Sequence, residues 1–199
     1  MFHLFQKGGP IMWPLFLTSV ISLAVILERI SFILTEKFKR DRQTAENMIA
    51  EVGEGNIDEA IERGERSGDF VVRVMTYGLK HAGKSFSSAV VHSATQELKR
   101  FQKGLPVLDT VVTLAPLLGL LSTVTGMIHA FGILGNRELD TPTVITGGIS
   151  EALIGTAFGL AIAVMALIPL NYLNARLETA RQEIEDCVTR LELLLKSTI

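Results

Sequence analysis

The chain lacks the residues that several kinds of site require. Its 199 residues include a single cysteine, Cys187, which can form no internal disulfide and has no metal-ligand spacing around it. A formal net charge of -2 provides no basic surface of the kind that binds nucleic acid. The sequence has neither an internal repeat nor a low-complexity tract. We therefore expect no cofactor, no metal and no nucleic-acid partner.

Sequence features typical of an enzyme are also missing. Cys187 has no nearby base, and "GGIS" at 147–150 lacks both the lysine and the preceding strand of a phosphate-binding loop. The histidines are scattered along the chain, at His3, His81, His92 and His129. The sequence therefore predicts a protein that is not an enzyme.

Charge is absent from three long stretches, residues 8–27, 110–136 and 152–175. Hydrophobic residues make up 48% of the chain, and its mean hydropathy is +0.36. At about 1.5 Å per residue, each stretch is long enough to cross a hydrocarbon core of roughly 30 Å. For the first stretch a cleaved signal peptide is the alternative, but Glu28 and Arg29 stand where a cleavage site of small residues is expected. The sequence thus predicts an all-α membrane protein with three transmembrane helices.

The distribution of Lys and Arg predicts the orientation. Thirteen of the 19 lie between the first and second spans and four follow the third, whereas only Lys7 and Arg137 lie on the other side. Because basic residues are enriched on the cytoplasmic side, the N-terminus is expected in the periplasm and the C-terminus in the cytoplasm. The predicted segments are a periplasmic N-terminus (1–9), a first span (10–28), a cytoplasmic helical loop (29–108), a second span (109–134), a short periplasmic loop (135–144), a third span (145–173) and a cytoplasmic C-terminal helix (174–199).

The cytoplasmic loop is predicted to be helical throughout. Glycines within 53–55 end its first helix, and Asn56 can cap the next one. Farther along, helical spacing puts Phe70, Val74 and Tyr77 on one face.

The second and third spans are predicted to continue into cytoplasmic helices. From Ser87 onward nothing stops a helix before Gly104 and Pro106, so one helix should enter the second span with a kink at Pro106. Neither Gly nor Pro follows Pro169, so the third helix should project well beyond the bilayer. An apolar stripe continues along it and favours packing against a partner helix: Leu173, Leu177, Ile184, Val188, Leu191 and Leu195.

Helical placement gives the second and third spans two unlike sides each, one with small and polar residues and one that resembles a lipid-facing surface. Small residues let helix backbones approach closely, so packing of the two spans on each other is one interpretation. A pore wall is the other. The small residues that we predict to face a pore are Gly119, Ser122, Gly126, Gly155 and Gly159.

Glu151 is not needed for packing. A carboxylate inside a membrane costs at least about 3 kcal/mol, and no Lys or Arg lies in any predicted span to pair with it. If the third span ends near Asn171, Glu151 lies near the outer rim and Thr156 about 7.5 Å deeper. A rim carboxylate above a threonine favours a hydrated, proton-accessible path. The alternative is a glutamate that reaches water near the N-terminal end of its helix.

Two longer motifs resemble the signature spans of the MotA/TolQ/ExbB proton-channel family, and are closest to its ExbB/TolQ branch. They are "APLLGLLSTVTGMIHAF" (115–131) and "ISEALIGTAFGLAIAVMALIPLNYL" (149–173). Further similarities are "LAVILERI" at the end of the first span, "NIDEAIERGERS" in the loop and "ELKRFQKGLPVLDTVVTLAPLLG" entering the second span. The resemblance covers nearly the whole chain.

The resemblance implies a ring, pentameric in the family, around a dimer of a single-span ExbD- or TolR-like partner in the bacterial inner membrane. It also implies that ion flow moves the partner, which passes work to a TonB- or TolA-like protein. The family's ion path corresponds here to Thr123, Glu151 and Thr156, while an aspartate of the partner carries the proton. Whether the ion is H⁺ or Na⁺, and whether the role is ExbB-like uptake or TolQ-like envelope integrity, stays open. Flagellar stator subunits of the wider family have four spans, so three spans argue against that branch.

The chain departs from the family pattern at two places. Ser122 stands where the family often has glycine, and Met165 stands where it has proline, with Pro169 one turn later. Any proline kink should therefore move about 6 Å toward the cytoplasm. The competing function is a non-conducting membrane scaffold whose small-residue faces only assemble helices.

Overall fold

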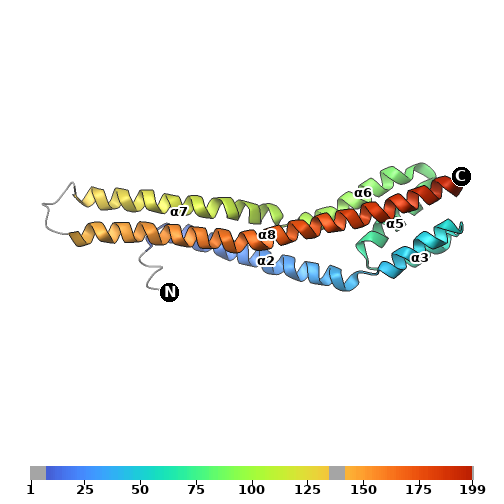
Figure 1. Cartoon of the computed structure of the whole chain (residues 1–199), viewed down its shortest axis with the longest axis horizontal. Helices are drawn as coiled ribbons and strands as arrows, with labels where there is room; N and C mark the ends of the chain where they lie inside the picture. The colour runs from blue at the N-terminus through green and yellow to red at the C-terminus, as the bar shows by residue number, and fades with distance from the viewer. Residues whose placement is uncertain (1–7, 135–141, 199) are drawn as a thin grey trace. The chain divides into compact units, whose positions relative to one another are not determined.

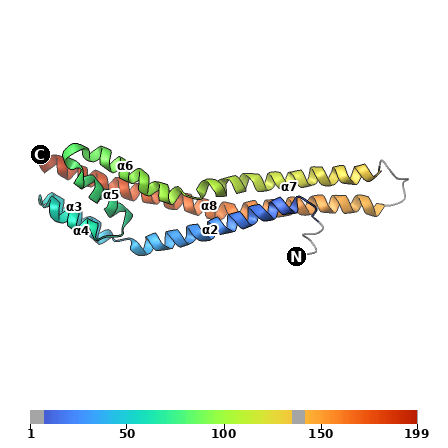
Figure 2. The same cartoon turned by 180° about the vertical axis from the view of Figure 1, so that it is seen from behind.

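A computed structural model describes residues 8–134 and 142–198 of the chain. Every regular element in this part is an α-helix, as the sequence predicts (Figures 1 and 2). The helices are α2 (Met12–Lys39), α3 (Arg42–Gly53), α4 (Ile57–Glu65), α5 (Phe70–Lys80), α6 (Ala82–Gln102), α7 (Leu105–Leu134) and α8 (Pro142–Thr198).

The chain divides into two compact units, each assembled from separate parts of the sequence. Unit 1 comprises Met1–Glu28 and Gly104–Tyr172, and unit 2 comprises Arg29–Lys103 and Leu173–Ile199. The long helices α2 and α8 therefore contribute residues to both units. Each unit has its own hydrophobic cluster.

Three helical stretches are long and apolar enough to cross a membrane, which confirms the predicted number of spans. They fall within Met12–Lys39, Ala82–Gly132 and Gly147–Leu195. In the most apolar 18 residues of each stretch, only 17 to 28% are buried. Large hydrophobic side chains in unit 1, such as Trp13, Leu117 and Ile168, are more than half exposed. A lipid environment satisfies such a surface, whereas water would not.

The helix predicted to run from Ser87 through Gly104 into the second span is interrupted, so the prediction of one continuous helix is wrong. Helix α6 ends at Gln102 and α7 begins at Leu105. Gly104 adopts a positive φ of 82°, which residues with a side chain rarely take. Pro106 falls in the first turn of α7, where a missing backbone N–H costs no hydrogen bond, so the break lies at Gly104 and not at a proline kink.

Helix α8 continues without interruption through Pro169. Its C-terminal part carries the apolar stripe into the core of unit 2, where Ile184 and Leu191 are buried. The predicted packing of this stripe against partner helices is confirmed. Side chains of α3 and α5 supply most of the remaining core, including Met48, Val74 and Met75.

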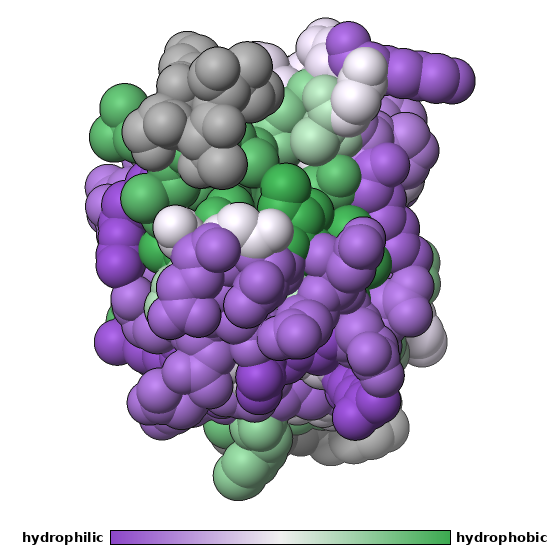
Figure 3. Space-filling model, turned by 90° about the vertical axis from the view of Figure 1, so that its right-hand side faces the viewer, coloured by the Kyte–Doolittle hydropathy of each residue, from purple (hydrophilic) through white to green (hydrophobic). Residues whose placement is uncertain are grey.

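Helix α4 begins directly after Asn56, as the sequence predicts. Asn56 occupies the N-cap of α4, but its side chain makes no capping hydrogen bond. Phe70 and Val74 are buried on α5 as expected, whereas Tyr77 is 38% exposed. Hydrophilic side chains cover most of the unit 2 surface seen in Figure 3, in keeping with a solvent-exposed location.

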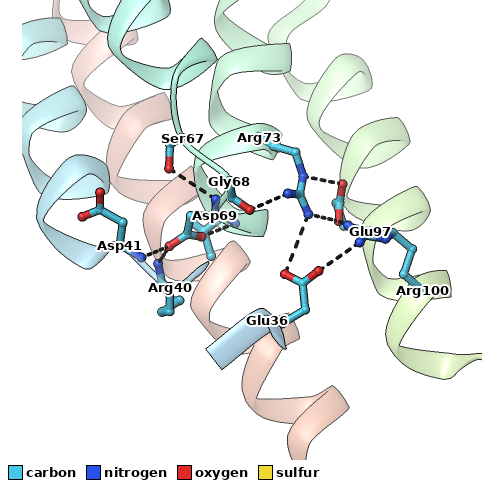
Figure 4. Close-up of polar contacts among 10 residues, drawn as sticks. Glu36, Arg40, Asp41, Ser67, Gly68, Asp69, Arg73, Glu97 and Arg100 are labelled. Atoms are coloured by element: carbon cyan, nitrogen blue, oxygen red, sulfur yellow. Dashed lines mark hydrogen bonds and ion pairs between the residues drawn. The ribbon is translucent and has the colours of Figure 1, made fainter. Parts of the chain in front are cut away.

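A buried polar network joins the helices of unit 2 (Figure 4). Fully buried Asp69 pairs with Arg40, which directly follows α2, and accepts the backbone N–H of Asp41 at 2.6 Å and of Val71 at 2.8 Å. The guanidinium of Arg40 also donates to Glu183 of α8 at 3.0 Å. Asp69 therefore ties the end of α2 to the start of α5, and Arg40 extends the connection to α8.

A second part of the network connects α2, α5 and α6. The Arg73 guanidinium donates to both carboxylate oxygens of Glu97, at 2.9 and 2.8 Å, and Arg100 donates to Glu97 at 2.7 Å. Arg100 also donates to buried Glu36 at 2.9 Å. Two arginines between two carboxylates hold the three helices in one arrangement.

We expect unit 2 to lose stability in acid, because carboxylates in it have lowered pKa values. Burial raises the pKa of Glu97, but hydrogen bonds from Arg73 and Arg100 outweigh it and hold that pKa below its usual 4.5. The Arg190 guanidinium likewise lowers the pKa of Glu46. Because the unfolded chain then binds protons more readily than the folded chain, stability should be full above about pH 4.5 and fall as the pH drops through the lowered pKa values.

Amide hydrogen exchange of α5 and α6 at a series of pH values measures this effect. Glu97→Gln should be less stable than wild type at pH 7, and the difference should shrink as the pH falls below 4.5, the usual pKa of a glutamate. A difference that stays constant with pH would show that Glu97 does not contribute through its charge.

Candidate functional site

Helices α7 and α8 pack through their small residues. A methyl group at Gly159 would lie 2.5 Å from the Ala115 carbonyl oxygen and 3.0 Å from the Gly119 Cα. One at Gly126 would lie 2.9 Å from the Ala152 Cβ and 3.0 Å from the Gly148 carbonyl oxygen. Because real Cβ atoms rarely come so near to backbone atoms, only glycine permits this separation of the two helices.

The predicted pore-facing residues all lie in this helix pair. Gly119 faces the Thr156 backbone, and a methyl group there would be 3.1 Å from the Thr156 Cα. Gly155 lies directly against Ser122, which is 2% exposed. Within the single chain, these residues therefore pack α7 against α8, as one of the two interpretations of the sequence expects. Their role as a pore wall stays a prediction.

Thr156 connects the two helices by a hydrogen bond. Its hydroxyl donates to the Gly119 carbonyl oxygen of α7 at 2.8 Å, and the Ala152 carbonyl oxygen of its own helix lies 3.3 Å away. The Gly119 carbonyl is accessible to this hydroxyl because the glycines keep the backbones close. The Thr156 oxygen can still accept a hydrogen bond from water or another group.

Thr123 has a different environment. Its half-buried side chain donates a hydrogen bond of 2.6 Å to the Leu120 carbonyl oxygen of its own helix. It borders an open, mostly apolar surface of α7 formed by Val124, Met127, Ile128, Phe131 and Gly132. Its hydroxyl oxygen also retains the capacity to accept a hydrogen bond.

Glu151 is half-buried in unit 1. The described part of this unit contains no Lys or Arg, so the carboxylate has no intramolecular cation there. Helix α8 begins at Pro142, so Glu151 lies about 13 Å along it. Its carboxylate lies against the backbone of Gly9, because a methyl group on Gly9 would overlap its Oε1 atom.

The structure brings one predicted ion-path residue against a predicted pore-facing glycine, but it does not bring the three ion-path residues together. Thr156 is in direct contact with Gly119. Within the described ranges, no hydrogen bond joins Thr123, Glu151 and Thr156 to one another. Their assignment to an ion path stays a prediction.

The position of Gly9 beside Glu151 is not predicted by the sequence. Its contact with Glu151 joins residues 142 positions apart, and no periodic pattern connects them. The signal that could have drawn attention to it is "GGP" at 8–10, a combination typical of a tight turn.

Comparison with known proteins gives a consistent result. The sequence pattern described as the MotA/TolQ/ExbB proton channel family matches residues 69–186. This range includes all of α5, α6 and α7 and much of α8, and therefore Thr123, Glu151 and Thr156.

Individual relatives agree with this match. The chain is 34% identical over 178 residues to biopolymer transport protein ExbB-like 1 of Synechocystis, which covers 85% of this chain and 68% of that protein. It is 33% identical over 100 residues to Tol-Pal system protein TolQ of Haemophilus influenzae, covering 50% of this chain and 44% of the relative. Biopolymer transport protein ExbB of Neisseria gonorrhoeae is 33% identical over 94 residues, which are 47% of this chain and 43% of the relative.

Proposed function

Because this chain belongs to the MotA/TolQ/ExbB proton channel family, ExbB/TolQ branch, we propose that it is the channel subunit of an ion-driven motor in the bacterial inner membrane. The observation that carries the proposal is the environment of Glu151. A half-buried carboxylate without a cation in the described part of unit 1 lies on the helix that pairs with α7 through small residues and Thr156. Packing alone does not require such a group, since an intramembrane carboxylate is costly.

In the proposed path, this chain lines the route and does not carry the proton alone. The hydroxyls of Thr123 and Thr156 each donate to a carbonyl and can accept from a hydrated proton or a water molecule. Glu151 provides negative charge that attracts a cation. The family resemblance implies that the main carrier is an aspartate of an ExbD- or TolR-like partner helix. This fits the present chain, whose predicted spans contain no carboxylate other than Glu151 well inside their ends.

The proposed assembly is a pentameric ring around a dimer of the single-span partner. The exposed apolar side chains of unit 1 suit contacts with lipid and with neighbouring copies. In this proposal, the N-terminus lies in the periplasm and unit 2 lies in the cytoplasm, because most Lys and Arg residues belong to unit 2.

The proposed work is done on proteins of the periplasm or outer membrane. One charge that crosses 100 mV releases about 2.3 kcal/mol, and several such steps can drive a rotation or a conformational cycle. The partner would pass this work to a TonB-like protein in nutrient uptake or to a TolA-like protein in envelope integrity.

A non-conducting scaffold is the second candidate. The observation in its favour is that all five small residues are buried in the contact between α7 and α8. A scaffold requires neither the charge of Glu151 nor a hydrogen bond accepted by the Thr156 hydroxyl oxygen. Substitutions at these two positions therefore separate the two functions.

We expect Glu151→Gln to reduce proton-dependent work several-fold while the complex still assembles, because the amide keeps the shape of the side chain and removes its charge. Thr156→Ala should also reduce the work, and Thr156→Ser should retain most of it by keeping the hydroxyl. The measurement is uptake or envelope integrity in cells that lack the native subunit, with complex assembly followed by co-purification of the partner.

Leu153→Ala is a matched control because Leu153 lies on α8 and is 63% exposed. It should assemble and work as wild type does. Full work in Glu151→Gln and Thr156→Ala, with assembly unchanged, would support the scaffold instead.

A further inference from the structure

We propose that Gly9 is a positioning residue for Glu151. The backbone that precedes α2 lies against the Glu151 carboxylate and restricts where that carboxylate can point. The consequence for ion flow rests on the proposed function of Glu151, whereas the positioning itself can be measured separately.

Two independent features require glycine at this position. Gly9 adopts a φ of 71°, in the left-handed region that residues with a side chain rarely occupy. A methyl group there would overlap the Oε1 atom of Glu151, and it would lie 2.7 Å from the Cδ atom and 3.2 Å from the Cγ atom. Any larger residue at position 9 must therefore displace either the turn or the carboxylate.

The turn is fixed to the helix that follows it. The Gly9 carbonyl oxygen accepts the backbone N–H of Met12 at 3.2 Å, so Gly9 starts the turn that leads into α2. Gly8 is buried, and a methyl group there would lie 3.3 Å from the Ile154 Cγ2 atom of α8. The segment thus has contacts with both helices.

Helix α2 is in turn fixed by packing within unit 1. Met12 and Leu15 are 2% and 1% exposed and form a cluster with Ala115 and Ala163. The partly buried side chains of Phe158 and Ile162 pack against this cluster.

Glu151 lies on the same face of α8 as these contacts. Residues 151, 154, 158 and 162 are three or four apart, which places them in one row along a helix. The row of α8 residues that faces α2 therefore ends at Glu151. Gly9, in the turn before α2, is the residue that contacts the Glu151 side chain. The packing of α2 is what sets the position of Gly9 over the carboxylate.

Gly9→Ala in the intact complex tests the proposal. Alanine should force the Glu151 carboxylate away from the turn and expose it, so its modification by a hydrophobic carbodiimide should rise several-fold, as measured by mass spectrometry of the peptide. Ion-driven work should fall several-fold. Gly147→Ala is the matched control, since a methyl group at Gly147 meets nothing within 4 Å.

A double variant provides the test of specificity. Aspartate at position 151 is shorter by one methylene group and withdraws the carboxylate from the site of overlap. Gly9→Ala should therefore change carbodiimide modification and work much less in the Glu151→Asp background than in the wild-type background. Equal effects in both backgrounds would overturn the positioning role, as would unchanged modification of Glu151 in Gly9→Ala.

The two proposals fail in different ways. If Glu151→Gln leaves the work intact, the proposed function is wrong, yet a rise in Glu151 modification on Gly9→Ala would still support positioning. If Gly9→Ala lowers the work but leaves Glu151 modification unchanged, positioning is wrong while the proposed function stands.

Discussion

Replacing Asp69 with alanine should destabilise unit 2 by about 3–5 kcal/mol, the typical cost of removing one partner from a buried ion pair. Asp69 is fully buried, and its loss would leave the Arg40 guanidinium with Glu183 as its remaining carboxylate partner. The backbone N–H groups of Asp41 and Val71 would also lose their acceptor. We therefore expect faster local unfolding of the region where α2 ends and α5 begins.

Amide hydrogen exchange in the detergent-solubilised protein measures this opening locally. Peptides from α5 should exchange faster in Asp69→Ala, while peptides from α7 should change little because they belong to unit 1. Asp69→Asn should cost less, since the amide oxygen can still accept one of the backbone hydrogen bonds.

Glu46→Ala is a useful comparison for Asp69→Ala. It removes the pairing of Glu46 with Arg190, whose side chains are 52% and 44% exposed. An exposed ion pair contributes only about 0–1 kcal/mol. Similar effects of Glu46→Ala and Asp69→Ala would contradict the importance assigned to the buried network.

Gly159→Ala should disrupt the helix pair because the added methyl group meets backbone atoms of α7. The added Cβ would lie 2.5 Å from the Ala115 carbonyl oxygen and 3.0 Å from the Gly119 Cα, and backbone atoms cannot rotate away. Overpacking of this kind typically costs about 1–3 kcal/mol. The helices α7 and α8 should separate locally and weaken the Thr156 hydrogen bond to Gly119.

The matched variant is Gly147→Ala on the same helix. A methyl group there has open space around it, and alanine favours a helix by up to about 1 kcal/mol over glycine. Denaturant unfolding in detergent should therefore show a loss for Gly159→Ala and no loss for Gly147→Ala. Equal stability of the two variants would mean that α7 and α8 are not packed as closely as described.

The apolar architecture could be read from the sequence because it depends on local patterns. Uncharged stretches indicate spans, and the stripe that includes Ile184 and Leu191 indicates a buried helix face. The small residues at Gly119 and Gly155 also predicted close packing of two helices, which the structure shows. Each of these patterns is visible within a single segment.

The polar contacts could not be read in the same way. Arg40 contacts Asp69 and Glu183, which are 29 and 143 residues away in the sequence. Charged residues are common on solvated helix faces, so nothing in the sequence distinguishes those that become buried. The contact between Gly9 and Glu151 escaped prediction for the same reason, because it depends on how α2 packs on α8.

The helix break at Gly104 was missed because two signals compete there. Pro106 looks like the stronger interruption, but a proline in the first turn of a helix is well tolerated. Glycine with a positive φ provides the actual end of α6.

The most direct test of an ion path through this protein is proton flux in liposomes. The complex of this chain with its single-span partner, purified and reconstituted, should let protons enter under an imposed membrane potential, as followed by an internal pH-sensitive dye. Glu151→Gln, assembled to the same extent, should reduce the rate several-fold, while Leu153→Ala should match wild type. The proposed path would be contradicted if liposomes with the wild-type complex were as impermeable to protons as empty liposomes. An undiminished proton entry rate with Glu151→Gln would contradict it as well.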